Sequence, residues 1–359
     1  MTAAAATAAA RIKTTIGRRE YLDWLRGIAV LIMIEAHVID SWTRTADRRT
    51  QGFFDSMILG GFGAPLFLFL AGVAVSLSAN AKFRRSNDTR SSSRAVMRRG
   101  LQIFALAFLF RIQAWILGGS PPWYLLKVDI LNIMGPSIIA AGALWGLAHS
   151  TAVRVGIFAG TTAGIAFITP IVRNLSIVAA LPDPIEAYIN PVPALTNFTF
   201  FPWSGLLFAG ALAGVILDHA RDGTHERWTN AAFLLTGLGV AALAYWLSFR
   251  PSLLPSRFWT TSPAFFFIRA GLMTAAVGLA YFWELRPRGK SAWSPLRQLG
   301  RTSLFIYWIH VEMVYGIISF PVRRALSLTG AWIALGIFCV FMLLCSILKD
   351  RIARRWQAA

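Results

Sequence analysis

The 359-residue sequence contains little charge, because Asp, Glu, Lys and Arg together make up 14% of it. Soluble domains carry roughly 25% charged residues, and 56% of this chain is hydrophobic, which excludes an ordinary soluble domain. Cysteine is almost absent: Cys339 and Cys345 lie in one apolar stretch and predict buried packing, not a disulfide framework. Five histidines without an HExxH pattern predict no metal site. These absences favour a polytopic membrane protein.

The charge that is present is mostly basic, with 35 Lys and Arg against 16 Asp and Glu and a net charge of +19. The basic residues lie in short segments between apolar stretches, so we expect no nucleic-acid partner. Stretches of membrane-spanning length fall at about 22–43, 56–79, 98–117, 128–147, 152–171, 198–217, 229–249, 262–283, 300–320 and 329–348. The sequence therefore predicts an all-α, polytopic bundle of about 10 transmembrane helices in a lipid bilayer.

The distribution of Lys and Arg predicts the orientation of the bundle. If the N-terminus is inside, most of these residues lie in the inner segments, and the positive-inside rule places both termini in the cytoplasm. We expect a disordered basic cytoplasmic tail at 1–20, a transmembrane domain at 21–349 and a second basic cytoplasmic tail at 350–359.

Two uncharged features invite structural expectations. The proline-rich loop at about 172–197 is either a lid over an outer cavity or an ordered connector without a chemical role. Gly156, Gly160 and Gly164 recur at four-residue spacing, which predicts a closely packed helix face.

The first span, "DWLRGIAVLIMIEAHVIDSW" (23–42), carries more charge than a lipid-facing helix tolerates. A charged side chain at a helix centre costs roughly 2.5–3.5 kcal/mol. The eleven residues from Arg26 to His37 return to within about 20° of the start and rise roughly 16 Å. Asp23, Arg26, His37 and Asp40 therefore share one face, which is a functional candidate. Glu35 points about 180° away from Arg26 and is expected to pair with another helix.

Simpler roles remain open for part of this face. Asp23 and Arg26 could pair with each other near the helix end, and Asp40 could be interfacial. His37 lies several turns inside, where a structural histidine is the alternative to a working base.

The charged span belongs to a series of segments that resembles a known superfamily. "RGIAVLIMIEAH" (26–37) fits an Arg-x10-His pattern, and four further segments follow in family order: "GGFGAPLFLFLAGVAVSLS" (60–78), "DILNIMG" (129–135), "FPWSGLLFAGALAG" (201–214) and "LGRTSLFIYWIH" (299–310). Together they resemble the transmembrane acyltransferases, namely acyltransferase family 3 and the heparan-α-glucosaminide N-acetyltransferase catalytic-domain proteins.

The resemblance implies acyl transfer, often of acetyl, from cytoplasmic acyl-CoA to a hydroxyl or amine of a glycan or glycolipid on the far side. Acetyl-CoA is the expected donor, no metal is expected, and a bacterial inner membrane is the expected location. His37 occupies the family's histidine position and Arg26 its arginine position. A homodimer is left open.

Acyl transfer requires removal of a proton, and neutral imidazole suits that role near neutral pH. We predict His37 as general base in direct attack on the thioester, with an acetyl-histidine intermediate as the alternative. Asp40 could orient the imidazole, and Arg26 could hold pantetheine or the developing oxyanion.

The phosphates of CoA need cationic partners, and "KFRRSNDTRSSSRAVMRR" (82–99) is a dense cytoplasmic basic loop. Arg98 and Arg99 are the preferred contacts, while the positive-inside rule and anionic lipid are the alternative explanation of this charge. Polar and aromatic residues within spans are candidates for the substrate cavity: Arg111, Gln113, Trp203, Arg269, Tyr307 and His310.

Each cavity candidate has a plainer alternative. Arg111, Gln113 and Arg269 could serve structural pairing. Tyr307 and His310 share a helix stripe with Ser303 that could simply pack against the first helix. The competing function is a transporter or flippase with a charged pathway along the first helix. It predicts two related halves with broken helices in matching positions, and no such symmetry is found in the sequence.

Overall fold

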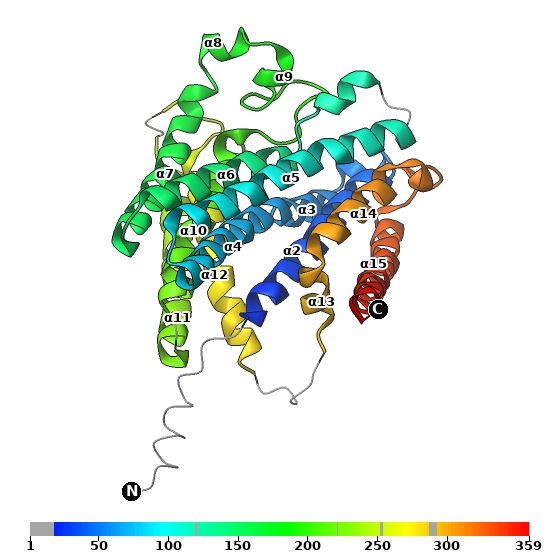
Figure 1. Ribbon diagram of the computed structural model, residues 1–359. Helices are drawn as coiled ribbons and strands as arrows, with labels where there is room; N and C mark the ends of the chain where they lie inside the picture. Colours follow the sequence, from blue (N-terminus) through cyan, green and yellow to red (C-terminus); the bar gives the residue numbers. More distant parts are fainter. Residues whose placement is uncertain (1–17, 119–120, 221, 252–253, 287–292, 359) are drawn as a thin grey trace, which may run out of the picture.

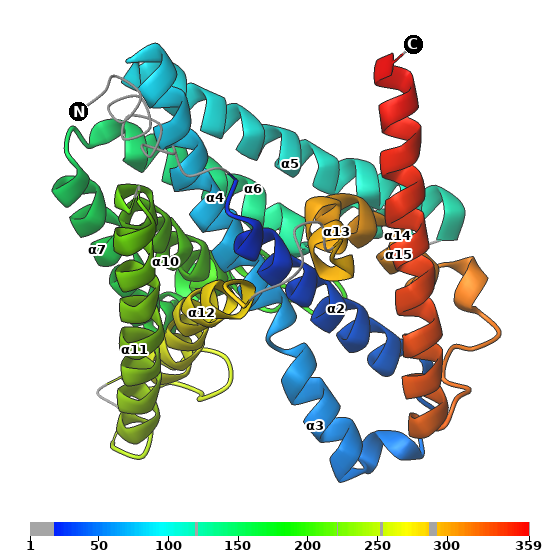
Figure 2. The same ribbon diagram turned by 90° about the horizontal axis from the view of Figure 1, so that it is seen from below.

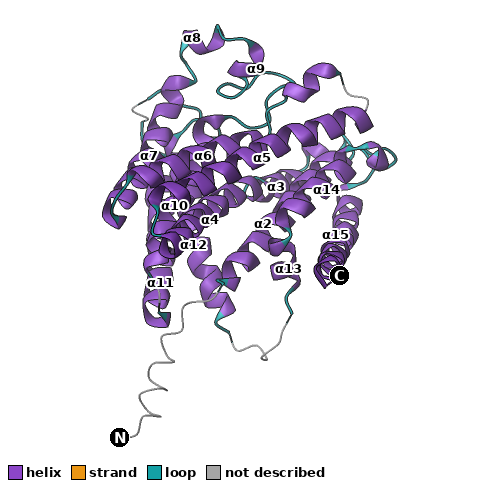
Figure 3. Ribbon diagram, in the orientation of Figure 1, coloured by secondary structure: helices purple, strands orange, loops and turns teal. Residues whose placement is uncertain are grey.

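The computed structural model describes residues 18–118, 121–220, 222–251, 254–286 and 293–358. Helices dominate, and no β-strand occurs in these ranges (Figures 1 and 3). The helices are α2 (Glu20–Trp42), α3 (Gln51–Gly60), α4 (Gly63–Ser86), α5 (Thr89–Gly118), α6 (Ile130–Leu147), α7 (Thr151–Val172), α8 (Ser176–Ala179), α9 (Asp183–Glu186), α10 (Phe200–His219), α11 (Gly223–Leu247), α12 (Pro263–Glu284), α13 (Pro295–Arg301), α14 (Ser303–Tyr315) and α15 (Leu328–Ala358).

The chain is an integral, multi-pass, all-α membrane protein. Within the described part of the chain, seven helical segments are long and apolar enough to cross a membrane: α3 with α4, α6, α7, α10, α11, α12 and α15. The other three predicted spans fall on α2, α5 and the broken helix α13–α14. Residues 1–17 of the predicted N-terminal tail (1–20) lie outside the described residues. The basic segment 350–358 is helical and continues α15.

The charged helix α2 lies inside the bundle. Figure 2 shows it running between α13, α14 and α15 on one side and α3 and α4 on the other. We call the end of the bundle where α2 begins and where α4 and α15 end the basic end, and the opposite end the far end. The buried side chains of Leu25, Val30 and Ile34 on α2 belong to the main hydrophobic core.

Glycines allow α2 and α13 to approach to backbone contact at the basic end. A Cβ atom on Gly300 of α13 would lie 1.8 Å from the carbonyl oxygen of Asp23, and one on Gly27 of α2 would lie 2.1 Å from that of Leu296. Neither position can hold a side chain without moving a helix. This contact fixes the start of α14 beside the charged face of α2.

The prediction that the glycine face of α7 packs closely against another helix is wrong. A Cβ atom on Gly156, Gly160 or Gly164 would have no atom within 4 Å, so this stripe lies open. Close packing occurs instead between α4 and α10, where a Cβ atom on Gly210 would lie 1.8 Å from the Phe69 carbonyl oxygen. Four-residue spacing places glycines on one face but does not determine whether another helix covers it.

The proline-rich loop forms an ordered segment at the far end, above α6 in Figure 1. It contains α8 and α9, and its Ala187 and Leu195 form a small core with Val128 and Ile133. Backbone hydrogen bonds between Val128 and the loop strengthen the contact. The loop is therefore anchored to the start of α6.

Candidate functional site

The charged residues at the start of α2 form an ion network. Asp23 is 3% exposed, and its carboxylate accepts hydrogen bonds from Arg18 and, at 2.9 Å, from Arg26. Arg301 of α13 lies 3.9 Å from the same carboxylate. The predicted pairing of Asp23 with Arg26 is present. The buried carboxylate thus holds two cations, Arg26 and Arg301, that face a cavity.

That cavity has a volume of about 480 Å³ and draws basic residues from four helices. Arg26 of α2, Arg99 of α5, Arg301 of α13 and Lys349 of α15 all line it. Four cations around one hollow make it attractive to an anion with more than one negative charge.

The remaining walls of the cavity suit an elongated anion with an apolar part. Gly300 and Ser303 place the junction of α13 and α14 on the lining, and Thr302 makes no side-chain cap at the start of α14. Uncapped N–H groups at a helix start favour negative charge. Phe305 and Trp308 add aromatic surface on the next turn of α14.

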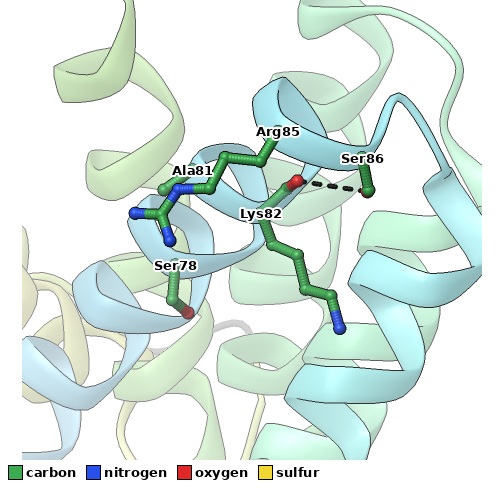
Figure 4. A pocket seen from close by; sticks show the side chains of 5 residues that line it. All are labelled: Ser78, Ala81, Lys82, Arg85 and Ser86. Carbon is green, nitrogen blue, oxygen red and sulfur yellow. Dashed lines mark hydrogen bonds between the residues drawn. The ribbon is translucent and has the colours of Figure 1, made fainter.

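Arg98, predicted beside Arg99 as a phosphate contact, is exposed and does not line this cavity. A second cavity of about 480 Å³ lies over the end of α4 and is lined by Ser78, Ala81, Lys82, Arg85 and Ser86 (Figure 4). Its residues come from one helix, and the side chains of Lys82 and Arg85 extend away from each other. Of these two cavities, the one at the α13–α14 junction combines convergent cations with a helix start.

His37 does not act alone, because α14 brings a second histidine to it. Nδ1 of His37 lies 3.0 Å from Nε2 of His310, and the two rings are nearly parallel, with a 15° interplanar angle. Nδ1 of His310 lies 2.8 Å from the carbonyl oxygen of Ile306. His310 is fully buried, whereas His37 is partly exposed. The predicted stripe on α14 therefore packs against α2 and also makes a polar contact there.

Aromatic side chains enclose the histidine pair. The ring of Tyr315 lies edge-on to that of His37, with 5.5 Å between the ring centroids. The ring of buried Tyr307 lies edge-on to that of His310, with 5.8 Å between the centroids. Tyr307 also packs on Phe67 of α4 and Phe110 of α5. The two histidines thus lie in a mostly apolar setting.

Asp40 does not orient His37. Its carboxylate pairs instead with Arg48 at 2.8 Å, from the segment after α2. The sequence alone did not show that the segment after α2 returns to this carboxylate. Asp129, the first residue of the quoted segment 129–135, and Asp40 both lie close enough to interact electrostatically with His37.

Asp129 joins a second polar cluster at the far end. It caps α6 and accepts a hydrogen bond at 2.6 Å from buried Arg111. Glu312 of α14 interacts electrostatically with Arg111 and has a buried carboxylate oxygen, Oε1, without a hydrogen-bond partner among the described residues. Gln113 accepts a hydrogen bond at 2.7 Å from Trp308, which links α5 to the cavity wall.

Trp203 and Arg269 form a separate contact, with the guanidinium 5.3 Å from the Trp203 ring and 4.0 Å from the Phe265 ring. Glu35 is 4% exposed, and neither of its carboxylate oxygens has a partner within the described ranges. Its predicted pairing with another helix is therefore absent there. These residues do not join the histidine pair.

Sequence reasoning missed two cavity cations, Arg301 and Lys349. In the sequence, neither stands out from the other basic residues outside the spans, which predict orientation alone. Arg301 follows Gly300 inside the quoted segment 299–310, and that position was the one available signal. Among the described residues, no group of three or more His, Cys, Asp or Glu is placed to hold a metal ion.

Comparison with protein families identifies the class. The family model for heparan-alpha-glucosaminide N-acetyltransferase, catalytic, matches residues 18–251. The chain belongs to this family. The comparison with curated proteins gives no match.

Family membership makes the protein a membrane acetyltransferase by class. The matched range contains His37, Arg26 and Arg99, whereas His310 and Arg301 lie beyond it. The structure brings residues from both parts together in the cavity and in the histidine pair.

Proposed function

We propose that the protein transfers an acetyl group from acetyl-CoA to a hydroxyl or amine of an extracytoplasmic glycan or glycolipid. His37 acts as general base. The observation that carries this proposal is the arrangement along α2, where Arg26 faces the cationic cavity and His37, about 16 Å further along the helix, meets His310. A donor held at one end can thus present its thioester towards the base.

The cavity fits the chemistry of the donor. CoA carries phosphate groups at one end of a long, thin arm, and phosphates favour Arg, Lys and helix N-termini. Arg26, Arg99, Arg301 and Lys349 would hold the phosphates, and Phe305 with Trp308 would contact the arm. This assignment keeps Arg26 as a donor-binding residue and gives Asp23 a supporting role through its ion pairs.

The histidine pair supports direct transfer. His37 accepts the proton of the acceptor hydroxyl or amine while the acceptor oxygen or nitrogen forms a bond to the acetyl carbon. The carbon–sulfur bond then breaks, and His37 returns the proton to the CoA sulfur. No external oxidant, reductant or metal is needed for this balance.

The orientation follows from charge. The basic end would face the cytoplasm, where acetyl-CoA is available, and both termini would lie there. The far end, with Arg111, Asp129 and Glu312, would face the compartment that contains the glycan. A bacterial inner membrane is consistent with this arrangement.

The proposal is tested by CoA release from acetyl-CoA by purified protein with a panel of glycans. Wild type should release CoA and acetylate an acceptor, whereas His37→Ala should not. Glu35→Gln is the matched control, because it alters an ionisable residue of the same helix outside the site. Equal turnover by wild type and His37→Ala would contradict the role of His37. If no acetyl-CoA is consumed while a glycan crosses the membrane, the transporter or flippase function is supported instead.

A further inference from the structure

The contacts of His310 determine which nitrogen atoms of the histidine pair carry protons. A backbone carbonyl only accepts hydrogen bonds, so the 2.8 Å contact with Ile306 requires a proton on Nδ1 of His310. In the neutral ring, Nε2 of His310 is then an acceptor. The 3.0 Å contact requires the proton of that hydrogen bond to be on Nδ1 of His37.

We infer that His310 is a positioning residue that holds His37 in the Nδ1–H tautomer and so leaves Nε2 of His37 as the basic nitrogen. This inference rests on the proposed function of His37. It assigns the catalytic proton to one named atom. It also explains why a fully buried histidine of α14 contacts the active face of α2.

The neighbouring carboxylates do not perform this task. Asp40 pairs with Arg48, and Asp129 with Arg111. Enzymes with a catalytic histidine often use a carboxylate to fix the tautomer, but an ionised carboxylate inside a membrane bundle is costly. A neutral imidazole provides an acceptor without a charge. The carbonyl of Ile306, one turn earlier on α14, prevents the His310 ring from offering its other tautomer.

Two amide substitutions separate positioning from packing. In His310→Gln the side-chain oxygen can occupy the place of Nε2 and accept from His37. In His310→Asn the shorter amide can still bond to the Ile306 carbonyl but cannot reach His37. We expect His310→Gln to retain most of kcat and His310→Asn to lose on the order of 100-fold. The KM for acetyl-CoA should stay unchanged in both, because the donor cavity does not include His310.

A measurement without turnover keeps this inference distinct from the proposed function. In protein labelled with 15N-histidine and reconstituted in nanodiscs, the ring shifts of His37 should report a protonated Nδ1 and a bare Nε2 in wild type and in His310→Gln. In His310→Asn this preference should be lost, and His37→Gln assigns the signals. A bare Nδ1 in wild type, or equal kcat for the two amide variants, would overturn the inference. Failure of wild type to release CoA would instead overturn the proposed function.

Discussion

The two ends of α2 use polar residues in different ways. At the basic end, Asp23 is buried beside Arg26 and Arg301, and these two cations also line a cavity. Further along, Nδ1 of His37 lies 3.0 Å from Nε2 of His310, and Nδ1 of His310 lies 2.8 Å from the carbonyl oxygen of Ile306. Under the proposed function the difference is a division of work: cations from several helices would bind the anionic donor, and the contact between the two histidines would prepare the base.

Removal of the base should have the largest effect. His37→Ala should lower kcat by roughly 10²–10⁴-fold, the usual contribution of a general base, while binding of acetyl-CoA at the basic end persists. Steady-state CoA release together with equilibrium binding of acetyl-CoA measures both quantities. If His37→Ala lost acetyl-CoA binding but kept kcat, His37 would belong to the donor site and not to the catalytic base.

Neutralisation of the cavity should affect the donor instead. Arg301→Gln removes a charge-assisted contact worth roughly 1.5–3 kcal/mol, so the KM for acetyl-CoA should rise about tenfold or more with little change in kcat. Arg85→Gln, in the one-helix cavity of α4, is the matched control and should leave KM unchanged. A larger KM in Arg85→Gln than in Arg301→Gln would place the donor in the other cavity.

The backbone contact that joins α2 to α13 should be sensitive to a single methyl group. Gly300→Ala should destabilise the fold by about 1–3 kcal/mol, because its Cβ atom would overlap the Asp23 carbonyl oxygen. Gly160→Ala, where the added atom meets nothing within 4 Å, should be neutral or slightly stabilising, within about 1 kcal/mol. Thermal unfolding in detergent compares the two variants. Equal stability of the two variants would show that the α2–α13 backbone contact does not constrain Gly300.

The smallest effect is expected in the loop after α2. The backbone N–H of Leu328 and the Arg44 side chain donate to the Asp47 carboxylate and hold its pKa below the ordinary value. A lowered folded-state pKa contributes stability above the ordinary value near 3.9, and that stability is lost as pH falls through the lower folded-state value. Asp47→Asn should therefore lower Tm slightly at pH 6, and the difference should vanish in strong acid. A difference that persists there would exclude the carboxylate as its cause.

Helical periodicity was sufficient to place Arg26 and His37 on one side of α2, because both belong to one regular helix. The catalytic role of that face stays a prediction. The family segments also identified the class. His310 was named only as a candidate, since its contact with His37 joins residues 273 positions apart and depends on how α14 packs. Periodicity specifies a face but not the partner that covers it.

The charge pattern predicts at which end of the bundle the basic residues lie, but not which residues they contact. The excess of basic residues predicts orientation but not that Arg301 and Lys349 converge with Arg26 and Arg99 on one cavity. Arg98 is adjacent to Arg99 in sequence but points elsewhere, because neighbours on a helix are about 100° apart. Asp40 was assigned to His37 by proximity along α2, whereas a loop arginine binds it in space.

The most direct test of the account is acetyl transfer across a bilayer. Proteoliposomes would contain the glycan panel and would receive acetyl-labelled CoA on the outside. Protease accessibility of the termini would report the fraction of molecules whose basic end faces outwards. The account predicts labelled glycan inside for wild type and for Glu35→Gln, and none for His37→Ala. Labelled glycan formed equally by His37→Ala would contradict it, as would acetylation only when donor and acceptor share one side.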